Sequence, residues 1–179
     1  MPRLLSTLIA LLHVGTALAT TTPARSGCGD PVAVSQAYAT FDADVLDVES
    51  SLVVSVARPA SLPHGAPEKA CQGERCLVQL VNLDPPTDQT TAAVTKKRLA
   101  SLVRNHAATI LVSPVQDRPE YINAVVLIED ESINEALLDA GLASYRSFAL
   151  YALDGYLECM YLAEEQRARK ASRGMWAPR

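Results

Sequence analysis

The segment Val78–Asp88, VQLVNLDPPTD, is the part of the sequence around which the rest of the fold is predicted. Its first part, Val78–Leu83, is mostly β-branched or apolar and shows no helical periodicity, which predicts a buried strand. Asp84 follows, and Pro85 and Pro86 end the strand because neither proline has an N–H for a sheet hydrogen bond. The segment therefore predicts a carboxylate at the end of a buried strand, a position suited to a catalytic or binding group.

Length and composition indicate an ordinary globular protein. A chain of 179 residues favours one domain with a sizeable core, and 49% hydrophobic and 20% charged residues are typical of such domains. The formal net charge of −4 argues against a protein that coats nucleic acid through its overall charge. A local basic groove remains compatible with it.

The N-terminus resembles a targeting segment. Arg3 precedes the apolar run Leu4–Leu18, and Ala17–Ala19 has the A-x-A pattern of a cleavage site, so residues 1–19 predict a cleaved signal peptide. The apolar run is shorter than the roughly 20 residues that a membrane span needs. An uncleaved anchor and a mitochondrial or other organelle transit peptide are the alternatives.

With residues 1–19 removed, the rest of the chain is expected to be an exported protein. Residues 20–31 are rich in Thr, Pro, Gly and Ser and predict a flexible leader, and residues 32–179 form the expected domain. No other stretch is long enough to cross a bilayer, so the mature chain is expected to have no membrane span. A secreted, periplasmic or lumenal location follows.

All four cysteines come after the expected cleavage site, which suggests two disulfides in an exported chain. Cys71 and Cys76 are close in sequence with Gly73 between them, so a local Cys71–Cys76 bridge is predicted, which leaves Cys28 to pair with Cys159. A zinc site is the weaker alternative, because no second Cys/His pair stands at ligand spacing. Free thiols would be expected in a reducing compartment.

Hydrophobic patterns predict strands first and helices later. The expected strands are residues 32–41, 45–56, 76–83, 109–115 and 121–128, with an acidic turn at Asp42–Asp44. The expected helices are residues 90–105, 133–140 and 156–172. Ser132 and Glu135 form a capping box for the second helix, and Gly141 and Gly174 end the last two. This order predicts an α+β fold with a short, curled five-stranded barrel.

Two C-terminal segments carry a family resemblance. Residues 133–143, INEALLDAGLA, and residues 162–176, LAEEQRARKASRGMW, resemble the last two helices of the staphylococcal-nuclease-like (thermonuclease) family. VQLVNLD resembles the family's strand that ends in an aspartate, and Asp42–Val45 resembles its D-G-D-T turn. The resemblance implies a five-stranded oligonucleotide-binding-type barrel with C-terminal helices.

The resemblance also implies a site. Nucleases of this family hold Ca²⁺ on two aspartates and a threonine, activate water with a glutamate and bind the phosphate with two arginines. The corresponding residues here are Asp44 and Asp84 for the metal aspartates, Pro85 for the threonine, Thr87 for the base, and Gln79 and Tyr121 for the arginines. A weak Ca²⁺ site at Asp44 and Asp84 is thus all that is expected of the metal centre.

The base and both cations are therefore absent together. General base catalysis and charge stabilisation each contribute orders of magnitude to phosphodiester hydrolysis, so loss of activity is expected. Asp88 stands one residue after the base position and Arg118 three before the second arginine position. They are the groups that a divergent phosphodiesterase would use instead.

Three hypotheses about function follow. The first is an exported, inactive nuclease-like domain that acts as a binding or assembly module for a protein or a nucleic acid. The second is a divergent, active Ca²⁺-dependent endonuclease, and the third is a structural subunit of a larger complex. The remaining charged and aromatic residues are expected to serve the fold. They are the solvated helix-face cations Lys96, Lys97, Arg98, Arg104, Arg167, Arg169, Lys170 and Arg173, and the packing residues Tyr145, Phe148, Tyr151, Tyr156 and Tyr161.

Overall fold

The computed structural model describes residue 28 and residues 38–147 and 155–178. The predicted signal peptide and all of the predicted leader except Cys28 lie outside the described residues. So do most of the first predicted strand, Phe148 and Tyr151.

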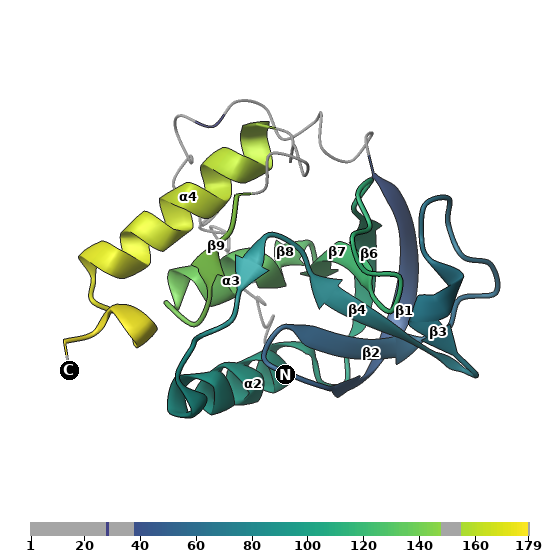
Figure 1. Ribbon diagram of the computed structural model, residues 1–179, viewed down its shortest axis with the longest axis horizontal. Helices are drawn as coiled ribbons and strands as arrows, with labels where there is room; N and C mark the ends of the chain where they lie inside the picture. Colours follow the sequence, from purple (N-terminus) through teal and green to yellow (C-terminus); the bar gives the residue numbers. More distant parts are fainter. Residues whose placement is uncertain (1–27, 29–37, 148–154, 179) are drawn as a thin grey trace, which may run out of the picture.

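Five strands close into a barrel (Figure 1). They are β1 (Ala39–Val48), β2 (Val53–Ala57), β4 (Arg75–Leu80), β6 (Ala107–Val112) and β7 (Ile122–Ile128). Antiparallel pairs give the order β4-β2-β1-β6-β7, and a parallel pairing of β4 with β7 closes the circle. Closure removes the open edges of the sheet, and it confirms the predicted α+β barrel.

Short strands and helices complete the domain. The short elements are η2 (Glu68–Ala70), β3 (Cys71–Gln72), β5 (Leu83–Asp84), β8 (Glu131–Ser132), β9 (Ser144–Tyr145) and η3 (Gly174–Trp176). The helices are α2 (Gln89–Val103), α3 (Ile133–Asp139) and α4 (Gly155–Lys170). Helix α3 packs against both β7 and α4, so it joins the barrel to the C-terminal helix (Figure 1).

The predicted acidic turn at Asp42–Asp44 is wrong. These residues lie within β1, where Asp42 pairs with Thr109 and Asp44 with Ala107. Exposure alternates along this stretch, with both aspartates in solvent and Ala43 buried, which is the period of a strand with one buried face. The turn follows β1 instead, at residues 49–52.

The core fills the barrel and the space between the barrel and the helices. Its largest fully buried side chains come from all of these elements: Val54, Val56, Val78, Leu80, Leu99, Val103, Ile110, Ile122, Leu137, Leu138, Met160 and Tyr161. Val78 and Leu80 confirm the buried part of the strand predicted from VQLVNLD, but β4 ends at Leu80 and not at Leu83 as predicted. Leu99 and Val103 form the buried face of α2.

The C-terminal clasp, defined here as Asp139, Gly141, Arg173, Gly174 and Trp176, joins the end of α3 to the end of the chain. Gly141 (φ +67°) and Gly174 (φ +53°) are both left-handed, and the N–H of Met175 donates to the carbonyl oxygen of Gly141 at 2.8 Å. A Cβ on Gly174 would meet that carbonyl well inside contact distance. Only glycine fits there. Gly141 ends α3 as predicted, but Gly174 does not end α4. That helix stops at Lys170, Ser172 takes the left-handed conformation (φ +51°) and the N–H of Arg173 donates to the carbonyl oxygen of Ala168, so Gly174 begins η3 instead.

Side chains reinforce the clasp. The Arg173 guanidinium donates to the Asp139 carboxylate at 2.7 Å, and the Arg169 guanidinium lies 3.7 Å from the centre of the Trp176 ring. Trp176 therefore folds back onto the body. At the other end of α3, the Ser132 hydroxyl accepts the N–H of Glu135 at 3.3 Å, which confirms the predicted N-cap.

Both predicted disulfides are present. Cys71 bonds Cys76 across the β3–β4 pair, and Cys28 bonds Cys159 in α4. Disulfides persist in oxidising compartments, which is compatible with export. Among the helices that the structure describes, none is both long and apolar enough to span a bilayer.

Candidate functional site

The end of β4 is where the predicted site residues begin. Gln79 lies between the buried Val78 and Leu80 and so points to the other face of the strand. Strand β4 then stops, and Asn82 takes a left-handed conformation with φ +59°. The turn lets residues 83–84 form β5, which pairs with β9 through Asp84 and Ser144. Asp84 is thereby held beside β9.

Arg146, directly after β9, places a positive charge beside Asp84 that was not predicted from the sequence. The N–H of Arg146 donates to the carbonyl oxygen of Asn82 at 2.9 Å, and its guanidinium donates to the Asp84 carboxylate at 3.2 Å. Both side chains are about half exposed, 46% and 45%. A lone arginine after a two-residue strand carries no sequence signal for this contact, because the contact depends on the β5–β9 pairing.

Beside this ion pair lies a small polar cavity of about 30 Å³, called here the polar recess. Its lining consists of Gln79, Leu80, Val81, Asn82, Leu83, Asp117, Asn123 and Arg146. Asn82 is only 6% exposed, and neither its side-chain oxygen nor its side-chain nitrogen has a hydrogen-bond partner among the described residues. The side-chain oxygen of Gln79 is also buried without a partner.

The opposite wall of the polar recess is held by a hydrogen-bonded loop. Gln116 accepts the N–H of Asn123 at 2.8 Å and donates to its carbonyl oxygen at 3.1 Å. The Asn123 side chain in turn donates to the Asp117 carboxylate at 2.7 Å. These bonds fix the carboxylate of Asp117 at the rim of the recess.

The two predicted metal aspartates do not lie together. Val45, next to Asp44, pairs with Val56, which pairs with Cys76. Asp44 is therefore level with the start of β4, whereas Asp84 follows its end. In the register of the sheet the two carboxylates stand at opposite ends of β4.

The remaining predicted residues are spread around the end of β4. Gln79 lines the polar recess, Thr87 is exposed, and Tyr121 is half-buried just before β7 outside the recess lining. Asp88 caps α2, where its carboxylate accepts the N–H of Thr91 at 2.8 Å. Arg118 is exposed in the loop before β7.

A sequence model of the staphylococcal nuclease homologue family matches residues 66–178, which is more than half of the chain. The chain belongs to this family. A search of the curated proteins finds no match to it. The matched region holds the polar recess, α2, α3, α4 and the C-terminal clasp, while β1 and β2 precede it.

The Ca²⁺ that nucleases of the staphylococcal nuclease family use does not fit the residues present. Asp84 is ion-paired with Arg146, and Pro85 offers no side-chain oxygen. Glu49, in the turn after β1, is paired with Arg75 at 3.3 Å. Within residues 38–147 and 155–178 no three His, Cys, Asp or Glu side chains gather as a metal site would require. A calcium site at Asp44 and Asp84 has no support from this arrangement.

The tyrosines near the recess pack the helices in this family member. Tyr145 and Tyr161 make an edge-to-face pair with ring centroids 6.1 Å apart, and Tyr156 packs against the core. Burial raises the pKa of Tyr161 well above its usual value, and the Glu135 carboxylate adds to the increase. Burial also raises the pKa of Tyr145. The packing role predicted for these three tyrosines is confirmed.

The basic residues divide into two groups. Lys96, Lys97, Arg98 and Arg104 are exposed on α2, as predicted for a solvated face. The cations near the C-terminus are used within the molecule, since Arg167 pairs with Glu164 at 2.8 Å and Arg169 with Glu165 at 3.2 Å. Arg173 belongs to the clasp. These internal pairs reduce the charge that α4 offers to an anionic ligand.

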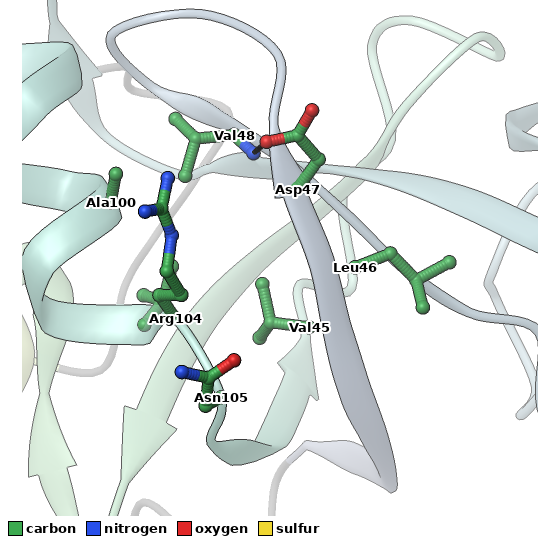
Figure 2. Close-up of a pocket in the computed structure, with 8 residues that line it drawn as sticks. Val45, Leu46, Asp47, Val48, Ala100, Arg104 and Asn105 are labelled. Carbon is green, nitrogen blue, oxygen red and sulfur yellow. Dashed lines mark hydrogen bonds between the residues drawn. The ribbon is translucent and has the colours of Figure 1, made fainter.

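A second hollow of about 50 Å³ lies between β1 and the end of α2 (Figure 2). The pairing of β1 with β2 shifts at Leu46, and the Leu46 side chain points away from the hollow into solvent. Asp47 accepts the N–H of Val48 at 2.8 Å, so its carboxylate serves the backbone. The hollow lacks the converging polar groups of the polar recess, which is the better candidate site.

Proposed function

We propose that this chain is an exported member of the staphylococcal nuclease family that has lost phosphodiesterase activity and binds a protein partner. The observation that carries the proposal is the chemistry at the end of β4. Gln79 and Tyr121 stand where the family's nucleases have arginines, and Thr87 stands where they have the base. Neither an amide nor a phenol supplies the guanidinium charge that stabilises a phosphoryl transition state.

The state of Asp84 supports the same conclusion. Its carboxylate accepts a hydrogen bond from Arg146 instead of standing in a cluster of oxygen ligands. The guanidinium at 3.2 Å already takes up an oxygen that Ca²⁺, which needs roughly six to eight oxygen ligands, would have to use.

Charge favours a protein over a nucleic acid as the partner. Without the predicted signal peptide the chain has 15 basic and 20 acidic residues, because Arg3 is removed from the total of 16 basic residues. Two of the three cations in the last turn of α4, Arg167 and Arg169, are paired with acidic neighbours. Affinity for nucleic acid depends on unpaired cations that neutralise phosphates, and α2 is the only helix of the described residues with a run of such exposed cations.

Export is supported by two observations. The two disulfides indicate an oxidising environment, and residues 1–19 have the pattern of a cleaved signal peptide. N-terminal sequencing of the protein purified from its native compartment tests this part of the proposal, with a new N-terminus at Thr20 expected.

One observation favours residual phosphodiesterase activity as the second candidate function. Arg146 brings a guanidinium to the site from a strand outside the family motif, and Asp117 adds a carboxylate nearby. One cation and one acid restore part of what an active site needs, although neither stands at the family position.

The test is a nuclease assay with plasmid DNA, single-stranded DNA and RNA, in Ca²⁺ and in a chelator. We expect no turnover above that of a matched blank purification. Asp84→Ala and Arg146→Ala are the informative variants, and Glu131→Ala is the control because it removes an exposed carboxylate from β8. Ca²⁺-dependent turnover that disappears in both informative variants and persists in the control would overturn the proposed loss of activity.

Purification from the native compartment then separates a binding module from a structural subunit. A subunit would leave the column in a fixed stoichiometric complex that survives high salt. A module would exchange with its partner and run as a monomer when the partner is removed.

A further inference from the structure

We propose that the polar recess binds the guanidinium group of an arginine side chain on the protein partner. The inference rests on the proposed function, because it takes the partner to be a protein. It adds the site and the chemical group by which the partner is held.

The first argument is the set of buried polar atoms without partners. The side-chain oxygens of Gln79 and Asn82 and the side-chain nitrogen of Asn82 are buried in the recess with no hydrogen-bond partner among the described residues. Buried polar atoms in folded proteins are nearly always hydrogen-bonded. Asp139 and Trp176 of the clasp each have one such atom, whereas three gather around this one cavity, and that grouping points to a ligand. Two of the three atoms are acceptors, which favours a ligand rich in donors.

The second argument is charge. The recess and the ion pair beside it hold the carboxylates of Asp84 and Asp117 and the guanidinium of Arg146, which sum to a formal charge of −1. The positions that hold phosphate in the family's nucleases are the uncharged Gln79 and Tyr121. The positive charges that would hold an anion at these two positions are therefore absent, and Asp117 supplies a carboxylate in the recess lining that a cation can meet.

The third argument is size and shape. A cavity of about 30 Å³ has room for one small head group and none for a nucleobase ring. Gln79 and Asn123 face each other across the parallel β4–β7 pair, so their amides stand on opposite strands of one opening. A guanidinium is planar and has five N–H donors, and it is less strongly hydrated than an ammonium, which favours arginine over lysine in a half-buried site.

The fourth argument is rigidity. The backbone on either side of Asn82 is fixed, since the N–H of Val81 donates to Ala124 and the carbonyl oxygen of Asn82 accepts from Arg146. Asn123 is fixed by Gln116 and Asp117. A site whose groups are already ordered loses little conformational entropy when it binds a ligand.

The experiment titrates the full, disulfide-bonded chain with N-acetyl-argininamide and follows side-chain amide resonances by NMR. We expect saturable shifts of the Gln79 and Asn82 side-chain amides. The matching lysine derivative is expected to shift them at least about tenfold more weakly, and inorganic phosphate is expected to leave them in place.

Variants assign the binding to the recess. Asn82→Gly keeps the left-handed backbone and removes the amide, so affinity for N-acetyl-argininamide is expected to fall at least about tenfold. Gln79→Leu should weaken binding similarly and provides a second test if Asn82→Gly does not fold. The control is Gln72→Leu, the same chemical change at an exposed position in β3, which should bind as the unaltered chain does.

Each outcome decides the proposal. No saturable shift with N-acetyl-argininamide, unchanged binding by both recess variants, or tighter binding of phosphate or an oligonucleotide at these resonances would overturn it. The nuclease assay is independent of this titration. Arginine binding together with Ca²⁺-dependent turnover would overturn the proposed function and leave the proposed arginine site standing. If neither binding nor turnover is found, only the arginine site is overturned.

Discussion

The C-terminal clasp and the polar recess belong to the same family domain and differ in how their groups are held. In the clasp, Gly141 and Gly174 hold a left-handed contact that only glycine fits, and Arg173 is bonded to Asp139. In the recess, the amides of Gln79 and Asn82 keep buried atoms without partners. The chain therefore closes on itself at one end of the domain, while at the other end buried polar groups gather around a cavity.

This difference indicates that the two regions have different roles. The close backbone contact and the Arg173–Asp139 bond of the clasp stabilise the folded state. The clasp also has two buried polar atoms without a hydrogen-bond partner, Asp139 Oδ1 and Trp176 Nε1, but neither residue lines the recess. A buried polar atom without a partner costs about 1–3 kcal/mol, and such costs persist in proteins mainly where the residues have another role. The clasp is thus expected to respond to substitution through stability, and the recess through binding.

The largest expected effect concerns the disulfide that ties α4 to Cys28. Its sequence separation is 131, and the chain-entropy relation gives a stabilisation of about 5 kcal/mol for a loop of that size. For the Cys71–Cys76 bridge, with a separation of 5, the same relation gives about 2 kcal/mol. Urea unfolding of the two double alanine variants, Cys28→Ala/Cys159→Ala and Cys71→Ala/Cys76→Ala, measures both. A larger loss from the short bridge would contradict the expectation.

The next effect tests the clasp itself. Gly174→Ala adds a Cβ against the Gly141 carbonyl and a left-handed strain, and we expect a loss of about 3 kcal/mol in the free energy of unfolding. Gly73→Ala is the matched control, because Gly73 has a similar φ of +60° and open space around it. Its loss should be about 1 kcal/mol. Equal losses in the two variants would show that the close approach in the clasp contributes nothing.

What could be predicted from the sequence depended on whether the feature has a local signal. Gly141 at the end of α3, the N-cap at Ser132 and the buried residues of β4 were predicted because each depends on a local signal: a glycine, a capping residue or an apolar run. The turn at Asp42–Asp44 was wrong because several acids close together resemble a turn. The pairing of β1 with β6 that holds them in a strand is not local. The family match likewise begins only at residue 66, after both of the first strands.

The residues of the candidate site also divide into those with a local sequence signal and those without one. Gln79 and Asp84 could be predicted as site positions because they are part of the strand motif. Arg146 could not, because its approach to Asp84 depends on a pairing of two-residue strands 60 residues apart in sequence. The buried amide of Asn82 was equally hidden, since an asparagine in a turn is usually exposed.

A smaller effect concerns the ionisation of Tyr161, a buried tyrosine at the junction of α3 and α4. Burial raises the pKa of Tyr161, so above about pH 10 the unfolded chain ionises this tyrosine while the folded chain keeps it neutral. Its contribution to stability is complete below pH 10 and is lost as the pH rises, by at most about 1.4 kcal/mol for each pH unit. Tyr161→Phe should therefore lose less stability than the unaltered chain between pH 10 and 11 in urea unfolding. Parallel curves for the two proteins would show that Tyr161 ionises normally.

The smallest effect concerns the ion pair beside the recess. Arg146 and Asp84 are each about half exposed, so a double-mutant cycle of Arg146→Gln and Asp84→Asn should give a coupling of about 0.2–1 kcal/mol that falls with salt. The matched cycle in the clasp, Arg173→Gln with Asp139→Asn, should give a larger value. Its distance is 2.7 Å against 3.2 Å, and the guanidinium of Arg167 lies 3.8 Å from the other oxygen of the Asp139 carboxylate. If the recess pair coupled as strongly as the clasp pair, Arg146 would be fixing the fold there. A weak coupling leaves Arg146 available to adjust when the recess takes a ligand, which is the behaviour expected of a binding site.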